Sequence, residues 1–197
     1  CSFCPRSDPS YEDINEFIDS NLHSKLINQL KNLNYGGVIR YSGFVEPLLD
    51  KNIYNLVKEV SLKIPNCRRE IVTNGDVLNG ERLKKLFDSG LSTILISVYD
   101  GPEDAKKFEK MCLDNNLRND QFVIRHRYYS EEKDFGLTIS NRAGMMKNAE
   151  YNIQPLQKSL NLKCYYPSYT FFMDYNGDVL MCPHDWGKKI ILGNLKK

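Results

Sequence analysis

Cysteines stand at spacings that suit metal chemistry. Cys1 and Cys4 enclose two residues, and Cys164 and Cys182 lie eighteen positions apart in the last third of the chain. A C-x-x-C pair is found in dithiol redox proteins, in halves of zinc sites and in iron–sulfur sites. A dithiol pair is usually followed by a helix, but a loop with two prolines follows Cys4. A zinc site needs a second close pair, which the sequence lacks. Taken alone, the pair leaves all three kinds of site open.

Polar residues that could bind a ligand or take part in a reaction follow the expected strands. Gly43 and Glu46 come after a strand at 38–41, Thr73 and Asn74 close a strand at 70–73, and Ser97 lies near the end of a strand at 92–98. Arg125 and Arg127 lie on a strand at 122–126 and share one of its faces, because side chains alternate along a strand. The ends of neighbouring parallel strands meet, so these side chains are expected at one edge of a sheet.

Helical patterns separate these strands. Apolar residues recur at helical spacing over 14–33, with a break near Asn21, and again over 53–60, 83–87 and 105–112. Asp50 is expected to cap the second helix, Gly90 to end the third and Pro102 to begin the fourth. The alternation predicts an α/β fold with a parallel sheet and right-handed crossovers.

The C-terminal region has a different pattern. Asn176-Gly177 between apolar stretches is a strong β-hairpin signal. Cys182 comes five residues after Gly177, on the expected returning strand, and Ile191-Leu192-Gly193-Asn194 follows. Cys67 and Cys112 belong to no such motif, and Cys112 lies on an apolar helix face, so both are expected to be buried thiols.

Composition excludes several classes of function. The chain has 197 residues, of which 41% are hydrophobic, and its formal net charge is +2. So small a surplus argues against nucleic acid as a partner, and the absence of a long apolar run argues against a membrane span. Cysteines outside a disulfide scaffold favour a reducing compartment, so a cytoplasmic protein is expected.

The N-terminal motifs resemble those of the radical S-adenosylmethionine (radical SAM) superfamily. Its cluster loop reads C-x3-C-x-aromatic-C, and Cys1-Ser2-Phe3-Cys4 resembles the last four positions of that loop. The first cysteine is then expected four positions before Cys1. Ser42-Gly43-Phe44-Val45-Glu46-Pro47 resembles the family's G-F-G-E-P segment, with Val45 in place of a glycine.

The resemblance implies a partial (βα)6 TIM-like barrel with a [4Fe–4S] cluster on Cys1 and Cys4. Phe3 would lie against the adenine of S-adenosylmethionine, and Gly43 and Glu46 would hold its ammonium group. The remaining binding candidates that the resemblance implies are Thr73, Asn74, Ser97 and Arg125. The strand that precedes the cluster loop would lie before Cys1.

The C-terminal pattern resembles the start of a SPASM or twitch extension, a β-hairpin-containing segment that binds an auxiliary iron–sulfur cluster. The resemblance implies Cys164 and Cys182 as cluster ligands and Arg142 as a substrate contact. Residues 1–146 would form the barrel and residues 147–197 the start of the extension.

The implied activity is reductive cleavage of S-adenosylmethionine to a 5′-deoxyadenosyl radical that takes a hydrogen atom from a substrate. The eighteen-residue cysteine spacing resembles that of radical dehydrogenases acting on amino sugars or aminocyclitols, although peptide-modifying members share the motifs. Net oxidation of a small molecule, or modification of a peptide, is expected, with flavodoxin or ferredoxin as electron donor. A non-catalytic iron–sulfur or zinc module and a C-x-x-C redox protein are the alternatives.

Overall fold

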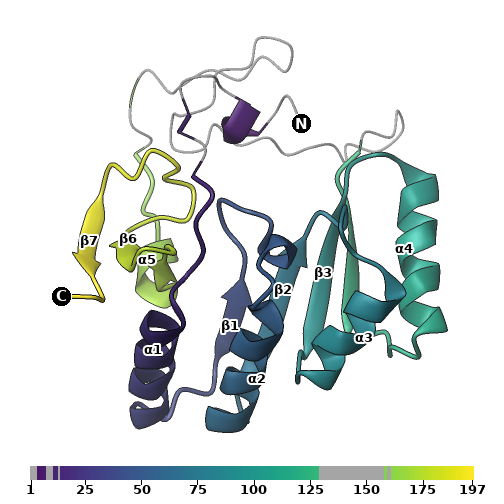
Figure 1. The fold of residues 1–197 in the computed structure, drawn as a ribbon. Coiled ribbons are helices and arrows are strands. Elements are labelled where there is room, and N and C mark those ends of the chain that lie inside the picture. Colours follow the sequence, from purple (N-terminus) through teal and green to yellow (C-terminus); the bar gives the residue numbers. More distant parts are fainter. Residues whose placement is uncertain (1–3, 8–10, 13, 129–157, 159–160) are drawn as a thin grey trace. The chain divides into compact units, whose positions relative to one another are not determined.

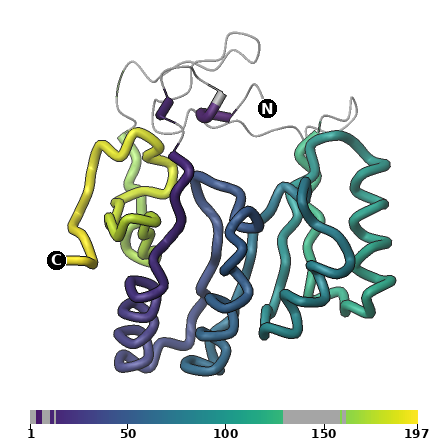
Figure 2. Tube along the Cα trace, in the orientation of Figure 1, coloured from purple at the N-terminus to yellow at the C-terminus, as the bar shows by residue number. Residues whose placement is uncertain are grey.

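The computed structural model describes residues 4–7, 11–12, 14–128, 158 and 161–197. The chain divides into two compact units, residues 23–138 in one and residues 1–22 with 139–197 in the other. Figure 2 traces the chain through the described segments. Cys1, Phe3 and Arg142, and the expected domain boundary after residue 146, lie outside the described residues.

Four parallel strands form the sheet of the larger unit, in the order β1-β2-β3-β4. Their bounds are Val38–Tyr41, Arg68–Thr73, Thr93–Val98 and Phe122–His126. The register places Arg40 beside Glu70, Ile71 beside Ile94 and Ser97 beside Arg125. The α/β class with a parallel sheet is confirmed.

Helices alternate with these strands, as Figure 1 shows. Their bounds are Ser20–Asn32 for α1, Ile53–Lys63 for α2, Gly80–Asp88 for α3 and Pro102–Asp114 for α4, with a 3₁₀ turn, η2, at Pro47–Leu49. The Asn79 side chain accepts a hydrogen bond from the Arg82 N–H and so caps α3. Gly90, at a φ of 96°, lies just beyond the carboxyl end of α3, where a left-handed residue ends a helix.

One face of the parallel sheet carries the core. Ile71, Ile94 and Ile96 are fully buried there, against a cluster built from α2, α3 and α4 that includes Val57, Leu83, Leu86, Ala105, Phe108 and Cys112. The opposite face is called the open face here. Its side chains include Val38 and Val123, which are 43% and 44% exposed. The core therefore fixes the strands from the helix side. On the open face Glu70, Leu95 and Ser97 are also buried, at 6%, 7% and 5% exposed.

A smaller apolar cluster joins α1 to α2, around Ile27, Val60, Ile64 and Cys67. Beside it the buried His23 ring contacts Glu59 Oε2 through Nδ1 at 2.7 Å and Tyr41 Oη through Nε2 at 2.9 Å. The Glu59 carboxylate can only accept, so Nδ1 carries the hydrogen and Nε2 accepts from the Tyr41 hydroxyl. All the ring's polar atoms are thus satisfied by a neutral imidazole.

The other unit contains an antiparallel sheet in the order β5-β6-β7, with strands Phe172–Met173, Asp178–Leu180 and Ile191–Asn194. The expected hairpin joins β5 to β6, and Gly177 has a φ of 91° at its turn. The Asn194 amide donates to Asp178 Oδ1 at 2.8 Å and ties β7 to β6. Two short helical turns, Pro5–Ser7 (η1) and Tyr166–Tyr169 (α5), follow Cys4 and Cys164 closely.

Three local expectations are wrong. The first helix begins at Ser20 instead of near Ile14, because Asp19 Oδ1 accepts from the N–H groups of Asn21 and Leu22. Residue Asn52 occupies the cap position of α2, while the Asp50 carboxylate accepts from the Asn52 N–H one turn earlier. Strand β6 ends at Leu180, so Cys182 lies in the loop beyond it.

Candidate functional site

Glu46 is the centre of a hydrogen-bonded cradle at the carboxyl ends of β1 and β2. Its Oε1 accepts from the Thr73 hydroxyl at 2.8 Å and from the Leu48 N–H at 3.0 Å. Its Oε2 accepts from the Asn74 N–H at 2.8 Å. The structure therefore brings together Glu46, Thr73 and Asn74, three residues that the sequence predicted for one site.

The cradle leaves the Glu46 carboxylate able to take a cation. Burial raises its pKa, and the three hydrogen bonds oppose that rise only partly. A carboxylate has about four acceptor positions, of which three are used here, so one remains for a further donor. A ligand ammonium group in that position would be favoured both by the charge and by the open lone pair.

In the segment 42–47, the backbone requires a glycine at position 43. That residue has a φ of 129°, which side-chain-bearing residues avoid. Val45 is absent from the positive-φ residues and is 53% exposed, so its β-branched side chain fits the backbone without strain. The substitution of valine for the family's glycine therefore leaves the segment's backbone intact.

Ser97 and Arg125 lie side by side on the open face, one strand apart from each other. Ser97 is 5% exposed and Arg125 is partly buried. Burial lowers the pKa of Arg125, and the charges of Arg127 and Arg40 lower it further. Arg125 thus points into a region where several guanidinium groups gather.

Sequence reasoning missed two members of that region, Arg40 and Glu70. Arg40 donates from Nε and Nη2 to Glu70 Oε2 at 2.8 and 2.6 Å, and Glu70 is 6% exposed. The sequence shows both charged residues, but their pairing follows from the register that places Arg40 beside Glu70.

Three of the thiols that the sequence assigned to metal lie among the described residues and are accessible, whereas the other two described thiols are not. Cys4 and Cys182 are partly buried and Cys164 is exposed, and all three are free of disulfide bonds. Cys67 and Cys112 are buried, as expected, and burial raises the pKa of Cys112 to about 11.

Cys182 has a feature suited to a cluster ligand. Its Sγ accepts a hydrogen bond from the His184 N–H at 3.4 Å, and hydrogen bonds of this kind orient the sulfur of a metal ligand. Asp185, which is 5% exposed, accepts from the Ile190 N–H at 2.9 Å and holds the loop that contains Cys182. The ring of Trp186 lies 5.9 Å from that of Tyr11.

Within the described residues no three metal-ligating side chains form a group, so the set of cluster ligands stays a prediction.

Two family models match the chain. Residues 1–132 match the radical SAM superfamily, and residues 164–197 match the SPASM iron-sulfur cluster-binding domain. With the parallel sheet and the strand-end site, these matches establish that the chain belongs to the radical SAM superfamily and carries a SPASM-type segment. It is a radical SAM enzyme, and the family's cofactors are S-adenosylmethionine, a [4Fe–4S] cluster and auxiliary iron–sulfur chemistry.

One curated protein and two crystal structures are similar to this chain. The chain is 30% identical over 195 residues to the S-adenosyl-L-methionine-dependent 2-deoxy-scyllo-inosamine dehydrogenase of Niallia circulans, covering 99% of this chain and 72% of that protein. The crystal structure of BtrN in complex with AdoMet and 2-DOIA matches all of this chain and 72% of its own, with 27% identity and a TM-score of 0.77. The open conformation of BtrN, at 24% identity and a TM-score of 0.66, also shares the fold.

The part of the chain that the structure describes includes no helix with the length and apolar character needed to cross a membrane.

Proposed function

We propose that this protein is a radical dehydrogenase that oxidises a secondary alcohol on the ring of a small cyclic polyol. The observation that supports this most strongly is the match of all of this chain to BtrN, at a TM-score of 0.77. The dehydrogenase from Niallia circulans supports the same substrate class, an amino sugar or aminocyclitol.

The residues of the site have separate parts in this proposal. Glu46 accepts the ammonium of S-adenosylmethionine at its open lone pair, while Thr73 and Asn74 hold the carboxylate in place. Gly43 lets the backbone approach the ligand closely, and Ser97 with Arg125 lines the open face beside it. Phe3 would cover the adenine and Arg142 would contact the substrate, as predicted from the sequence.

The thiols would hold the inorganic groups. Cys1 and Cys4 would bind the first cluster, and Cys164 and Cys182 would bind the auxiliary cluster, with the His184 N–H donating to the Cys182 sulfur. When bound, these groups and S-adenosylmethionine supply a 5′-deoxyadenosyl radical and an electron acceptor.

In the proposed oxidation, the hydrogen atom on the ring carbon that carries the hydroxyl would go to the 5′-deoxyadenosyl group that the bound cofactor supplies. The hydroxyl proton would go to solvent and one electron to the acceptor that Cys164 and Cys182 would hold, which leaves a ketone. The protein's part is to position the ring C–H and to exclude competing hydrogen donors.

A labelled substrate tests this function. The natural protein, reconstituted anaerobically, is incubated with dithionite, S-adenosylmethionine and 2-deoxy-scyllo-inosamine carrying deuterium on its ring carbons. The proposal expects one deuterium in 5′-deoxyadenosine for each ketone formed. Formation of 5′-deoxyadenosine without deuterium, across a panel of labelled cyclic polyols, would reject this substrate class.

The proposal also includes an electron donor and a cellular compartment for the protein. A flavodoxin or a ferredoxin would deliver the electrons, and the cytoplasm would provide the reducing conditions that exposed thiols such as Cys164 require. Residues 1–146 would form the barrel and residues 147–197 the extension.

A further inference from the structure

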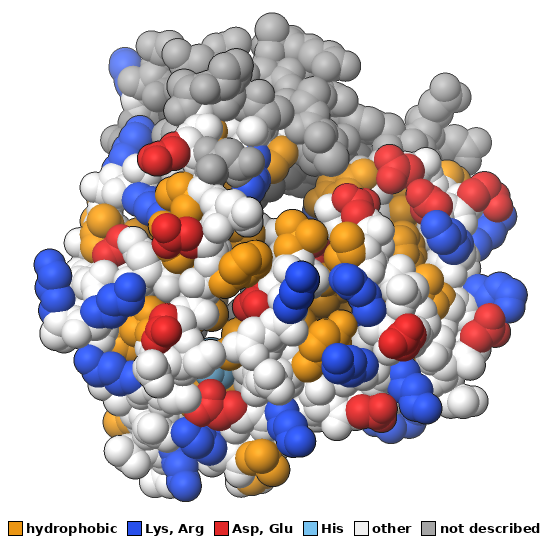
Figure 3. Space-filling view, viewed as in Figure 1, with side chains coloured by type: hydrophobic (Ala, Val, Ile, Leu, Met, Phe, Trp, Pro, Cys, Tyr) orange, Lys and Arg blue, Asp and Glu red, His pale blue; other side chains and the backbone are white. Residues whose placement is uncertain are grey.

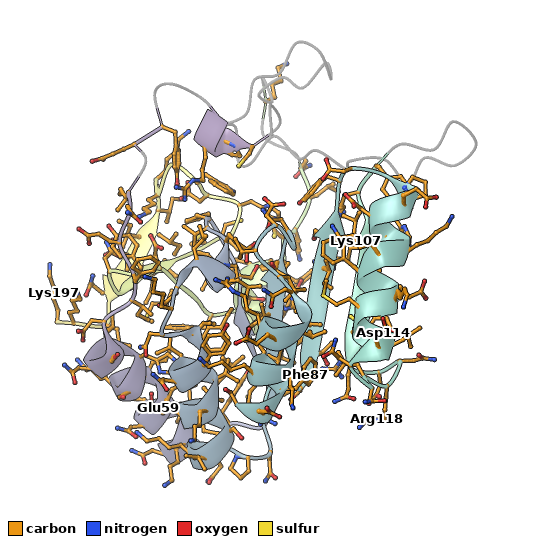
Figure 4. All side chains as sticks on the ribbon, turned by 45° about the vertical axis from the view of Figure 1, so that its right-hand side comes forward. Glu59, Phe87, Lys107, Asp114, Arg118 and Lys197 are labelled. Atoms are coloured by element: carbon orange, nitrogen blue, oxygen red, sulfur yellow. The ribbon has the colours of Figure 1, made fainter. Side chains whose placement is uncertain are left out.

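The chain that follows Cys4 packs on the C-terminal segment. Residues 1–22 belong to the same compact unit as residues 139–197. Figure 1 shows the purple chain before α1 beside the loop between β6 and β7, and Figure 4, where Lys197 labels the C-terminal end, shows the same two parts as neighbours. One unit therefore contains both a proposed ligand of the first cluster and the proposed ligands of the auxiliary cluster.

Tyr11 and Trp186 form an aromatic contact between these two parts. Their ring centroids lie 5.9 Å apart at an interplanar angle of 59°, an arrangement that aromatic pairs favour. Trp186 is 8% exposed, so its ring is closed to water. Tyr11 comes seven residues after Cys4, and Trp186 comes four residues after Cys182. Each ring thus belongs to the stretch of chain that follows a proposed cluster ligand.

A partly buried ion pair lies beside this contact. Lys188 Nζ pairs with Asp174 Oδ2, and the two side chains are 24% and 14% exposed. Lys188 has a φ of 49°, a conformation that residues other than glycine rarely adopt, so contacts such as this pair must hold it there. Figure 3 shows blue and red side chains intermingled on the face that it displays, as expected where charges are paired within the chain.

The hydroxyl of Tyr11 lies near Cys4 as well as near the ion pair. Burial raises the pKa of Tyr11, and the charges of the ion pair and of Cys4 also act on it. The 3₁₀ turn η1, Pro5–Ser7, follows Cys4 directly, and Pro5 is buried. We call residues 4–7 the Cys4 loop. The aromatic contact is therefore close enough to this loop to fix its position.

A second contact holds the far end of the N-terminal segment. Gly177 lies at the turn of the β5–β6 hairpin, and a Cβ at that position would lie 3.4 Å from Leu22 Cδ2. Leu22 is in the first turn of α1 and is 5% exposed. The N-terminal segment is thus attached to the C-terminal segment at Tyr11 and again at Leu22.

We propose that Tyr11 and Trp186 are positioning residues for the first cluster, and that through their contact the C-terminal segment holds the Cys4 loop in the position that binds iron. This inference rests on the proposed function and deepens it, because the Cys4 loop serves the same reaction. The C-terminal segment then has a second task besides holding the auxiliary cluster. Partners that orient a metal ligand usually contribute substantially to metal affinity.

Loss of iron from the first cluster tests the proposal. The anaerobic holoprotein is reduced with dithionite and given a chelator, and electron paramagnetic resonance follows the signal that changes on addition of S-adenosylmethionine. Trp186→Ala and Tyr11→Ala should each lose this signal about tenfold faster than the natural protein, because the Cys4 loop is released. Trp186→Phe keeps an aromatic ring and should stay close to the natural rate.

A double variant shows whether the two rings act as one contact. If they do, Tyr11→Ala with Trp186→Ala should lose the signal at about the rate of either single variant, whereas independent effects would multiply to about a hundredfold. Tyr169→Ala is the matched control, because Tyr169 is an aromatic residue of the same unit and is 71% exposed. It should leave the rate unchanged.

Thermal unfolding checks that each variant is folded. Tyr11 is only partly buried, so Tyr11→Ala carries the test if loss of the buried Trp186 ring unfolds the unit. A natural rate in a folded Tyr11→Ala or Trp186→Ala variant would overturn the inference. Effects that multiply in the double variant, or an equal effect of Tyr169→Ala, would do the same.

The outcome for this inference is separate from the outcome for the proposed oxidation. The measured signal belongs to the iron and requires no substrate. Faster loss in the two variants of a protein that oxidises no alcohol would reject the proposed function and leave the positioning role standing. A natural protein without a signal that responds to S-adenosylmethionine would reject both.

Discussion

At the scale of single residues, the thiols divide by accessibility. Cys4, Cys164 and Cys182 are accessible, while Cys67 and Cys112 are 2% and 0% exposed and burial raises the pKa of both. Because the thiolate is the reacting form, brief treatment of the native apoprotein with iodoacetamide should label the first three and spare the last two. Peptide mass spectrometry measures the labelling. Equal labelling of Cys112 and Cys164 would show that the assignment of roles is wrong.

Glu46 provides a second prediction at this scale. Glu46→Gln places an amide where three donors converge, and one of its N–H groups would meet a donor, so the folded state should lose about 1–3 kcal/mol. Affinity for S-adenosylmethionine should also fall at least tenfold, because the charge opposite its ammonium is lost. Urea unfolding and calorimetry measure the two effects.

The adjacent Val45 supplies the control. Val45→Gly should keep or improve cofactor affinity, since the exposed valine adopts an ordinary backbone conformation. A large loss of affinity in this variant, or none in Glu46→Gln, would contradict the cofactor role assigned to the segment.

At the scale of elements, the end of α3 depends on a glycine. Gly90 ends α3 at a φ of 96°, and a Cβ there would lie 2.3 Å from Ser61 Oγ of α2. Gly90→Ala should therefore cost about 1–2 kcal/mol or more of unfolding free energy, from the left-handed backbone and from the contact. Gly36→Ala is the control, because Gly36 has open space around it and should change stability by less than about 0.5 kcal/mol. Equal effects of the two would contradict the described end of α3.

The network that ties α1 to α2 and β1 predicts a pH dependence. Burial lowers the pKa of His23, which the Glu59 carboxylate opposes only partly, so the unfolded chain binds a proton more readily than the folded one. Stability should then fall as pH drops below about 6.5, the ordinary histidine pKa. Glu59, whose pKa is held at about 2 against the effect of burial by Lys63, Ser24 and His23, stays charged throughout this range.

Urea unfolding at pH 7.5 and pH 5.5 measures that slope. His23→Gln should flatten it, whereas His126→Gln, at an exposed position, should not. A slope that persists unchanged in His23→Gln would show that other groups cause it.

At the scale of the whole molecule, the sequence predicts the fold better than the site. Periodicity and glycine positions predicted β1 and β4 at their observed bounds, because short apolar runs between helical patterns leave a local signal. The predicted start of α1 was wrong because Asp19 accepts from the N–H groups of Asn21 and Leu22 and starts the helix there, and apolar periodicity does not record such a cap.

The sequence also predicted only part of the candidate site. Motif spacing found Glu46, Thr73 and Asn74, but it missed the Arg40–Glu70 pair, because that pair joins residues thirty positions apart through the strand register. Long-range pairing of this kind becomes visible only when the order and register of the strands are known.

The assignment of Cys164 and Cys182 to the auxiliary cluster predicts an effect on iron content. Cys164→Ala with Cys182→Ala should remove about four irons per chain after anaerobic reconstitution, since a four-iron cluster needs its thiolate ligands. The double variant Cys67→Ala with Cys112→Ala should keep its iron, although loss of buried packing should lower its stability. Chemical iron analysis decides between the two outcomes, and full iron in the first variant would exclude these thiols as ligands.

Cleavage of S-adenosylmethionine tests the central claim most directly. The natural protein, reconstituted with iron and sulfide under anaerobic conditions, is reduced with dithionite and given S-adenosylmethionine, and 5′-deoxyadenosine is measured by chromatography. We predict its formation, dependent on reductant and lost in Cys4→Ala. A fully iron-loaded protein that releases no 5′-deoxyadenosine, or a Cys4→Ala variant that still does, would contradict the account.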